Sequence, residues 1–206
     1  MVSKYSFRKF LKTGQLGPVR PGMTMMDVAR ELGPPGSWIL QRDEDHPTYW
    51  VYGHLEMLFA LEAPYRLRWF QLEHAEYLRG DGPFLGDREF DLDLDGLHGG
   101  MRPSDLLRRR IWKASDARVA IETKGIALTI GYRGLRVIYD LNNAGDEDAA
   151  MLEKTIEGGT IQQLVALCDR CGRLDSIYSY PDSEPDGAPQ AGVVRMDGAR
   201  YLRLLR

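Results

Sequence analysis

Residues 19–38 read VRPGMTMMDVARELGPPGSW, a short helical pattern between two sets of turn residues. Thr24 has a side chain that commonly caps a helix N-terminus, and Asp27 follows three residues later, where a carboxylate is favourable near free backbone N–H groups. The Gly-Pro-Pro-Gly sequence at 33–36 prevents the helix from continuing. This stretch therefore predicts a short helix that begins after Thr24 and ends before Gly33.

The segment at 100–110, GMRPSDLLRRR, repeats the beginning of this pattern. In both places a Gly-Met pair is followed, after three residues, by Asp and a branched aliphatic residue; the matching positions are Gly22, Met23, Asp27 and Val28, and Gly100, Met101, Asp105 and Leu106. Pro103 suits the first position of a helix. We interpret the match as an internal repeat and expect a second helix to begin at Pro103.

Three strand-like runs follow each of these predicted helices. The runs are 48–52, 54–61 and 66–73 after the first helix, and 117–123, 126–132 and 135–141 after the second. Strict alternation in the run 66–73 would put Leu67 and Trp69 on one face and Phe70 and Leu72 on the other. A further helix is expected at 6–12. The predicted fold class is α+β, with tandem units of one or two helices packed on an antiparallel sheet.

The predicted domain organisation has three parts. Residues 1–75 form the first unit, 76–142 contain a linking strand at 89–96 and the second unit, and 143–206 form a C-terminal extension or a third unit. In this last part Thr160 caps a helix, 174–180 is a strand, and Asp197-Gly198 is a hairpin signal between two short strands. The sequence leaves open whether this part is a third copy or extends the second sheet.

The composition points away from nucleic acid and from membranes. The 206 residues carry a formal net charge of −3, whereas nucleic-acid-binding domains usually have a basic excess on one face. The chain has no apolar stretch near 18 residues and no apolar signal core at its start. Its two cysteines lie too close together in sequence to connect distant segments. We expect a cytoplasmic protein; its oligomeric state stays open.

Three motifs could carry catalytic or metal chemistry, and each has an ordinary structural explanation. HAE at 74–76 with CDRC at 168–171 imitates a zinc deaminase signature, but Leu167 replaces its proline and the cysteines end a helix. DLDLDG at 91–96 imitates half of a calcium loop whose twelfth position is Arg102. The four histidines, His46, His54, His74 and His98, have no HExxH spacing. The sequence therefore predicts no catalytic residue, metal ligand or cofactor.

The first helix and its strands carry a family resemblance. Gly22, Met23, Thr24, Leu32, Gly33 and Pro34, followed by the strand pattern at 48–73, resemble outer-membrane assembly lipoproteins of the BamE/SmpA type. The tandem arrangement is similar to that of the β-lactamase inhibitor protein and, more loosely, to immunity proteins that neutralise bacterial toxins. The resemblance implies helical units packed on antiparallel sheets, and it implies that the function is protein binding.

Aromatic and arginine residues on the predicted strands are the candidate binding residues, because Tyr, Trp and Arg anchor many protein interfaces. They are Tyr49, Trp50, Tyr52, Arg66, Arg68, Trp69, Tyr132 and Arg133. Alternation requires about half of such rings to be buried. Acidic stretches at 81–95 and 182–186 could instead meet a basic partner. We therefore expect a non-enzymatic protein-binding protein, such as an immunity-type inhibitor of a bacterial toxin; the alternative is an enzyme or metal-binding protein with scattered site residues.

Overall fold

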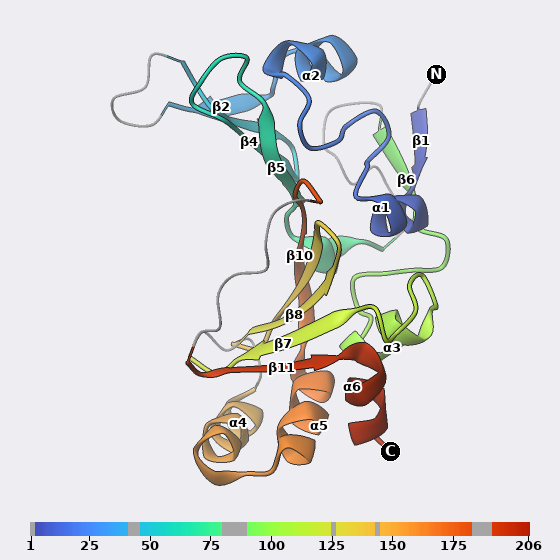
Figure 1. The fold of residues 1–206 in the computed structure, drawn as a ribbon, viewed down its shortest axis with the longest axis vertical. Coiled ribbons are helices and arrows are strands. Elements are labelled where there is room, and N and C mark those ends of the chain that lie inside the picture. Colours follow the sequence, from blue (N-terminus) through green and yellow to red (C-terminus); the bar gives the residue numbers. More distant parts are fainter. Residues whose placement is uncertain (1–2, 41–45, 80–89, 125–126, 143–144, 183–190) are drawn as a thin grey trace.

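The computed structural model describes residues 3–40, 46–79, 90–124, 127–142, 145–182 and 191–206. Within these ranges the chain forms a nine-stranded sheet in which all neighbouring strands are antiparallel, together with helices that cover one face, so the predicted α+β class is confirmed (Figure 1). No helix in the described part is long and apolar enough to cross a membrane.

The helices and strands predicted within residues 1–75 are present in the structure, together with elements that the sequence pattern did not predict. Its elements are α1 (Phe7–Thr13), α2 (Met25–Leu32), β2 (Ser37–Ile39), β3 (Tyr49–Tyr52), β4 (Leu55–Phe59), β5 (Leu67–Leu72) and the 3-10 helix η1 (Ala75–Tyr77). At the start of α2 the Thr24 hydroxyl accepts from the backbone N–H of Asp27, and the Asp27 carboxylate accepts from that of Thr24. Sequence-local capping therefore determines where α2 begins.

The second unit begins its helix in the same way. Its elements are α3 (Pro103–Arg108), β7 (Arg118–Glu122), β8 (Ala127–Tyr132) and β9 (Leu135–Asp140). The Asp105 carboxylate accepts from the backbone N–H of Arg102, as Asp27 does from Thr24. The expected linking strand is β6 (Phe90–Asp93), which pairs in parallel with β1 (Ser3–Ser6) in a separate small sheet. The helix start predicted at Pro103 is confirmed.

One C-terminal strand joins the two units. After α4 (Asp146–Gly158) and α5 (Ile161–Cys171), β10 (Arg173–Ser179) runs antiparallel to both β9 and β5. The strand order is β11-β7-β8-β9-β10-β5-β4-β3-β2, with β11 (Val193–Asp197) at one edge. Figure 1 shows β10 running between the upper and lower halves of the molecule. The two meanders are therefore parts of a single sheet.

The hairpin predicted around Asp197-Gly198 is wrong. β11 ends at Asp197, and the chain continues as α6 (Gly198–Leu204). The Asp197 carboxylate accepts from the backbone N–H of Arg200 at 2.8 Å, so it caps this helix. A Cβ at Gly198 would lie 2.8 Å from the Ala114 carbonyl oxygen, which explains the small residue there. The Asp197-Gly198 pair therefore begins α6, and the nearby Ala114 backbone leaves no room for a side chain at position 198.

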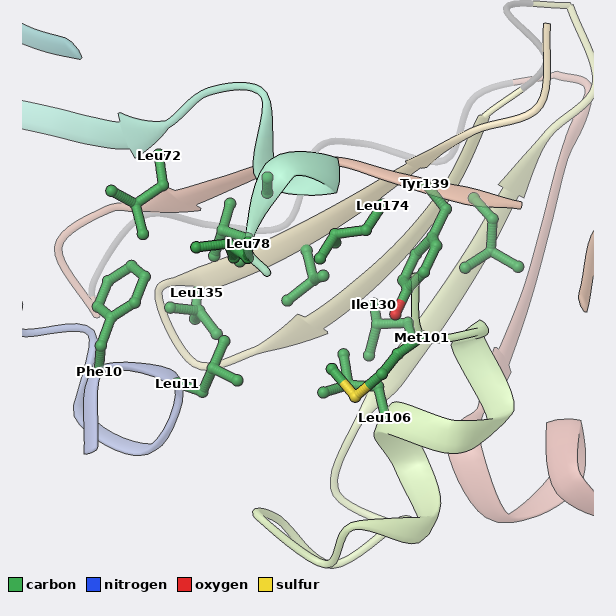
Figure 2. Close-up of a cluster of buried hydrophobic side chains, with 14 of the residues drawn as sticks. Phe10, Leu11, Leu72, Leu78, Met101, Leu106, Ile130, Leu135, Tyr139 and Leu174 are labelled. Atoms are coloured by element: carbon green, nitrogen blue, oxygen red, sulfur yellow. The ribbon is translucent and has the colours of Figure 1, made fainter. Parts of the chain in front are cut away.

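The hydrophobic core lies on one face of the sheet. The registers place the buried side chains of neighbouring strands in continuous rows, such as Met57 beside Phe70 and Leu128 beside Tyr139. Figure 2 shows Phe10 and Leu11 of α1, and Met101 and Leu106 at α3, on this side of the strands. The helices thus cover a single apolar face, which leaves the outer face of the sheet for other contacts.

Tyr139 contributes an unpaired hydroxyl to this core. Its side chain is fully buried, and the hydroxyl has no hydrogen-bond partner among the described residues. Burial of an unsatisfied hydroxyl is costly, whereas phenylalanine keeps the ring and its packing. We expect Tyr139→Phe to raise the free energy of unfolding by about 1 kcal/mol in urea titrations. A loss of stability would contradict the unpaired state of the hydroxyl.

Candidate functional site

The outer face is the sheet face opposite the core, and its side chains alternate with the buried ones. Tyr49, Glu56, Trp69 and Tyr178 lie on it, each partly exposed, because their strand neighbours Trp50, Met57, Phe70 and Ile177 point into the core. The face extends from β3 across β4, β5 and β10 to β9. It therefore combines side chains from both units and from the C-terminal strand.

Four aromatic rings form a continuous row on the outer face. Tyr49 contacts Trp69 at 5.9 Å between ring centroids, Trp69 contacts Tyr178 at 5.5 Å, and Tyr178 stacks on Tyr180 at 5.8 Å. The Arg136 guanidinium lies 4.4 Å from the centre of the Tyr180 ring. Large, partly exposed rings in mutual contact lose little side-chain entropy when a partner covers them. We name Tyr49, Trp69, Tyr178 and Tyr180 the aromatic row.

Two glutamates lie beside this row. The Tyr49 hydroxyl donates to Glu56, the Gln71 amide donates to Glu56 Oε2 at 2.6 Å, and the carboxyl group of Glu73 lies close enough to that of Glu56 to interact with it. Each side chain belongs to, or directly follows, one of the strands β3, β4 and β5. We name the two carboxyl groups the Glu56–Glu73 pair. When both are ionised they repel each other, and a proton on one of them relieves this repulsion.

The pKa values of the pair move in opposite directions. The hydrogen bond to Glu56 raises the pKa of Glu73, and partial burial adds to the effect. Burial alone would raise the pKa of Glu56, but hydrogen bonds from Glu73, Tyr49 and Gln71 outweigh it and lower that pKa. A proton taken up by the pair therefore resides on Glu73. Burial, followed by the neighbouring Tyr180, raises the pKa of Tyr178 to about 12.

The other end of the same sheet carries arginines. A groove of about 970 Å³ crosses β7, β8, β9 and β11, and its lining includes Arg118, Arg136 and Arg195. Arg118 and Arg136 both lie opposite Gly131 in the sheet register. The same groove is also lined by Asp116, Glu122 and Asp197, so it carries charges of both signs. Charged groups on a binding surface favour one orientation of a bound partner.

The structure brings only part of the predicted binding set to this face. Tyr49 and Trp69 lie in the aromatic row. Trp50 and Tyr52 are 8% and 3% exposed and lie in the core, which corrects their assignment to a binding surface. They alternate with Tyr49 along β3 and point toward the helices, where the Tyr52 hydroxyl donates to the Gly33 carbonyl.

The other predicted residues lie apart from the aromatic row. Arg66 precedes β5 and donates to the Gly22 carbonyl at 2.9 Å, a contact that fixes the segment before α2. Arg68 is exposed on β5. Tyr132 stacks on Trp112 at 5.5 Å on the helix side, and the guanidinium of Arg133 lies over the Tyr132 ring. Their positions correct the expectation of a single aromatic and arginine patch.

Sequence reasoning missed Glu56, Gln71, Glu73, Tyr178 and Arg136. The spacing of Tyr178 and Tyr180 by two residues on a predicted strand indicates that they share a face. Their place beside Trp69 depends on the pairing of β10 with β5, which no local pattern specifies. The Glu56–Glu73 pair likewise depends on the register of β4 against β5.

The cysteine motif lies inside the fold. Cys168 and Cys171 of α5 are free thiols and are 0% and 3% exposed. Burial raises the pKa of the Cys168 thiol to about 12, so this thiol stays protonated near neutral pH. Among the described residues, no group of three or more His, Cys, Asp or Glu side chains could hold a metal ion.

The calcium-like motif forms a strand and its following turn. Its first residues belong to β6, which pairs with β1, and Asp93 lies 3.9 Å from the ammonium group of Lys4. Asp95 accepts a hydrogen bond from the Ser6 hydroxyl at 2.6 Å. These contacts tie β6 to the N-terminal segment. The histidines His54 and His74 contact each other, with ring centroids 5.7 Å apart.

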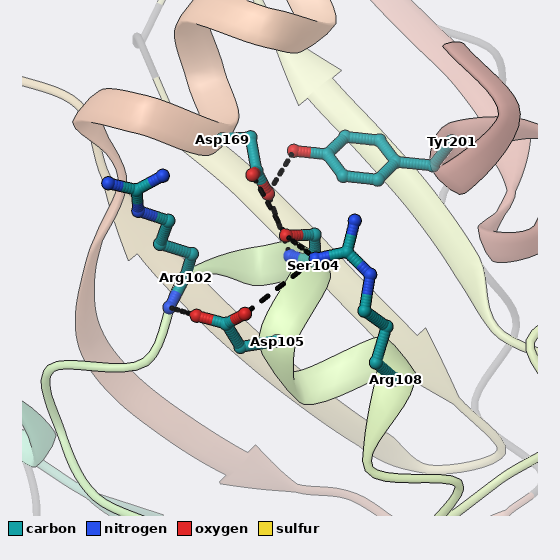
Figure 3. Close-up of polar contacts among 6 residues, drawn as sticks. All are labelled: Arg102, Ser104, Asp105, Arg108, Asp169 and Tyr201. Atoms are coloured by element: carbon teal, nitrogen blue, oxygen red, sulfur yellow. Dashed lines mark hydrogen bonds and ion pairs between the residues drawn. The ribbon is translucent and has the colours of Figure 1, made fainter. Parts of the chain in front are cut away.

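A buried polar cluster connects three helices on the core side (Figure 3). The Asp169 carboxylate of α5 accepts from the Ser104 backbone N–H at 2.7 Å, from the Ser104 hydroxyl at 2.9 Å and from the Tyr201 hydroxyl at 3.3 Å. Arg108 donates to the Ser104 hydroxyl at 3.0 Å. Since all donors to Asp169 come from α3 and α6, the cluster is a structural link between helices.

No protein-family model matches this chain, and comparison with curated proteins and with solved structures gives no match either. The resemblance to BamE/SmpA-type and inhibitor-type units therefore stays a hypothesis. What the protein does must be inferred from its own sequence and geometry.

Proposed function

We propose that this chain is a non-enzymatic protein-binding protein whose binding surface is the outer face of the sheet. The observation that carries this proposal is the aromatic row of Tyr49, Trp69, Tyr178 and Tyr180, held in contact across three non-consecutive parts of the chain. Tyr and Trp dominate the energetic centres of protein interfaces. The row spans the face from β3 to β10, and Glu56 of β4 lies within this span.

The charged side chains of the outer face support a partner with complementary charges. The carboxyl groups of Glu56 and Glu73 favour a basic patch on the partner, and the groove over β7, β9 and β11, which holds arginines and carboxylates together, favours a patch of mixed charge. A bacterial toxin with a basic active site is one such partner, which would make this chain an immunity-type inhibitor. The inhibitor-like helix and sheet units are consistent with that assignment.

The proposal predicts a loss of binding in the double variant Trp69→Ala/Tyr178→Ala. Each truncation removes a large ring from the centre of the face, and together they should lower the affinity for the partner at least about 30-fold. Tagged wild type and variant are used as baits in a lysate of the organism that encodes the chain, and captured proteins are quantified by mass spectrometry. The matched control is Met151→Ala, an exposed apolar residue of α4.

At least one protein should be captured by wild type and by the control but not by the double variant. Capture of the same proteins by all three baits would refute the outer face as the binding surface. For the toxin assignment, the captured protein is expressed alone and with this chain. Co-expression of wild type should restore growth, whereas the double variant should not. A captured protein that is harmless when expressed alone would contradict the inhibitor role.

A further inference from the structure

The Glu56–Glu73 pair is rich in hydrogen-bond acceptors and has no strong cation beside it. None of the ion pairs among the described residues joins Glu56 or Glu73 to a lysine or arginine. Tyr49 and Gln71 donate hydrogen bonds to Glu56. Two neighbouring carboxyl groups repel when both are ionised. A cationic ligand would relieve this repulsion, as a shared proton does.

Gln71 supplies a second, independent sign of a ligand. Its side chain is only 4% exposed, and its amide nitrogen donates to Glu56, so the amide lies within the glutamate cluster. The other amide atom, Oε1, is buried and has no hydrogen-bond partner among the described residues. A buried carbonyl oxygen without a donor is costly. What this cluster lacks is N–H donors and positive charge.

Tyrosine rings border the cluster. Tyr178 lies directly opposite Gln71 in the register of β10 and β5, and Tyr49 donates to Glu56. The same aromatic row already binds a guanidinium, because Arg136 lies over Tyr180. A planar guanidinium can stack on such a ring and donate several hydrogen bonds at its edge.

We propose that Glu56, Glu73 and the Gln71 carbonyl oxygen, bordered by Tyr49 and Tyr178, form a receptor for an arginine side chain presented by the partner protein. This inference rests on the proposed function and names the partner side chain that the outer face would bind. A guanidinium has five N–H donors in a fixed plane, enough to reach both carboxylates and the amide oxygen. A lysine ammonium fits less well, because its three donors all come from one nitrogen atom. An uncharged ligand such as a sugar would not neutralise the carboxylates.

Binding of arginine at this receptor should release the shared proton. The titratable groups that face Glu73 are Glu56 on β4, Tyr49 on β3, Asp175 and Tyr178 on β10, and His74, which contacts His54. The raised pKa of Glu73 means that the free protein takes up this proton at a higher pH than an isolated glutamate would. A bound cation favours both carboxylates in their charged forms. Affinity should therefore rise as the pH increases through the pKa of Glu73.

The test uses a small probe, N-acetyl-arginine methylamide, with its neutral isostere N-acetyl-citrulline methylamide as control. The full-length protein is labelled with ¹⁵N, and the indole signal of Trp69 is identified by its loss in Trp69→Phe. We expect the arginine probe to shift this signal at pH 7 with a dissociation constant of about 1–10 mM. The citrulline probe should bind at least about tenfold more weakly. The Trp112 indole, which donates to Leu11, should not shift.

The variant Glu73→Gln tests whether arginine binding needs the negative charge of Glu73 or only the shape of its side chain. Its amide can still donate to Glu56 and so imitates protonated Glu73, which keeps the cluster folded. We expect wild-type affinity for the arginine probe to increase about tenfold between pH 4.5 and pH 7, and the variant to bind weakly with no such increase. The matched control is Glu153→Gln, an exposed carboxylate of α4, which should behave as wild type.

Three results would overturn the receptor. The citrulline probe or a lysine probe could bind as tightly as the arginine probe, or Glu73→Gln could show the same pH dependence of binding as wild type. These outcomes are independent of the capture experiment. If Trp69→Ala/Tyr178→Ala loses the partner while Glu73→Gln captures it as wild type does, protein binding stands and the arginine receptor fails. If the arginine probe binds but the outer-face variant captures the same proteins as wild type, the proposed function fails.

Discussion

Phe70→Ala is expected to lower the free energy of unfolding by about 4 kcal/mol. The Phe70 ring is fully buried, stacks on Phe10 with centroids 5.7 Å apart, and lies beside Met57 in the sheet register. Its removal therefore opens a cavity between α1 and the sheet. Denaturation in guanidinium chloride, followed by circular dichroism, measures the change.

Trp69→Ala is the matched control for this prediction, because Trp69 directly precedes Phe70 in β5 but lies on the outer face. We expect it to cost only about 1–2 kcal/mol, mainly from the lost contacts with Tyr49 and Tyr178. A partly exposed ring loses less when it is truncated than a buried one does. If Trp69→Ala proved as destabilising as Phe70→Ala, the assignment of core and outer face in β5 would be wrong.

Phe70 and Trp69 also illustrate what the sequence could predict about the fold. The run 66–73 was predicted as a strand, and β5 confirms it, but strict alternation would put Leu67 and Phe70 on opposite faces. In the structure both are buried, because the register between β4 and β5 shifts between Leu67 and Trp69. A bulge of this kind changes which face a side chain occupies, and it depends on the partner strand. The sequence therefore predicts the strand but not its faces.

Helix starts were predictable because their chemistry is local. Thr24 with Asp27, and Thr160 with Gln163, form reciprocal caps within four residues. The position of β10 was not predictable, since it pairs with β5 from the first unit and β9 from the second. The candidate site depends on that pairing. Tyr49 and Trp69 could be proposed from their residue types, whereas Tyr178 and the Glu56–Glu73 pair required the assembled sheet.

Asp169→Ala is expected to be about as destabilising as Phe70→Ala, with a loss of about 4 kcal/mol. Asp169 is 7% exposed, and its carboxylate accepts two hydrogen bonds from Ser104 and one from Tyr201. Alanine would leave the Ser104 N–H and hydroxyl buried without their acceptor at the start of α3. Because the donors come from α3 and α6, the variant should loosen the packing of both helices against α5.

Two milder variants show which contacts of Asp169 matter. Tyr201→Phe removes only the longest hydrogen bond, at 3.3 Å, and should cost about 1 kcal/mol. Asp169→Asn keeps one oxygen acceptor but places an NH₂ group where the second acceptor was, so we expect an intermediate loss of about 2 kcal/mol. Equilibrium denaturation ranks the three variants. A cost for Asp169→Ala no greater than that for Tyr201→Phe would mean that Ser104 finds another acceptor, and that the buried carboxylate does not hold α3 to α5.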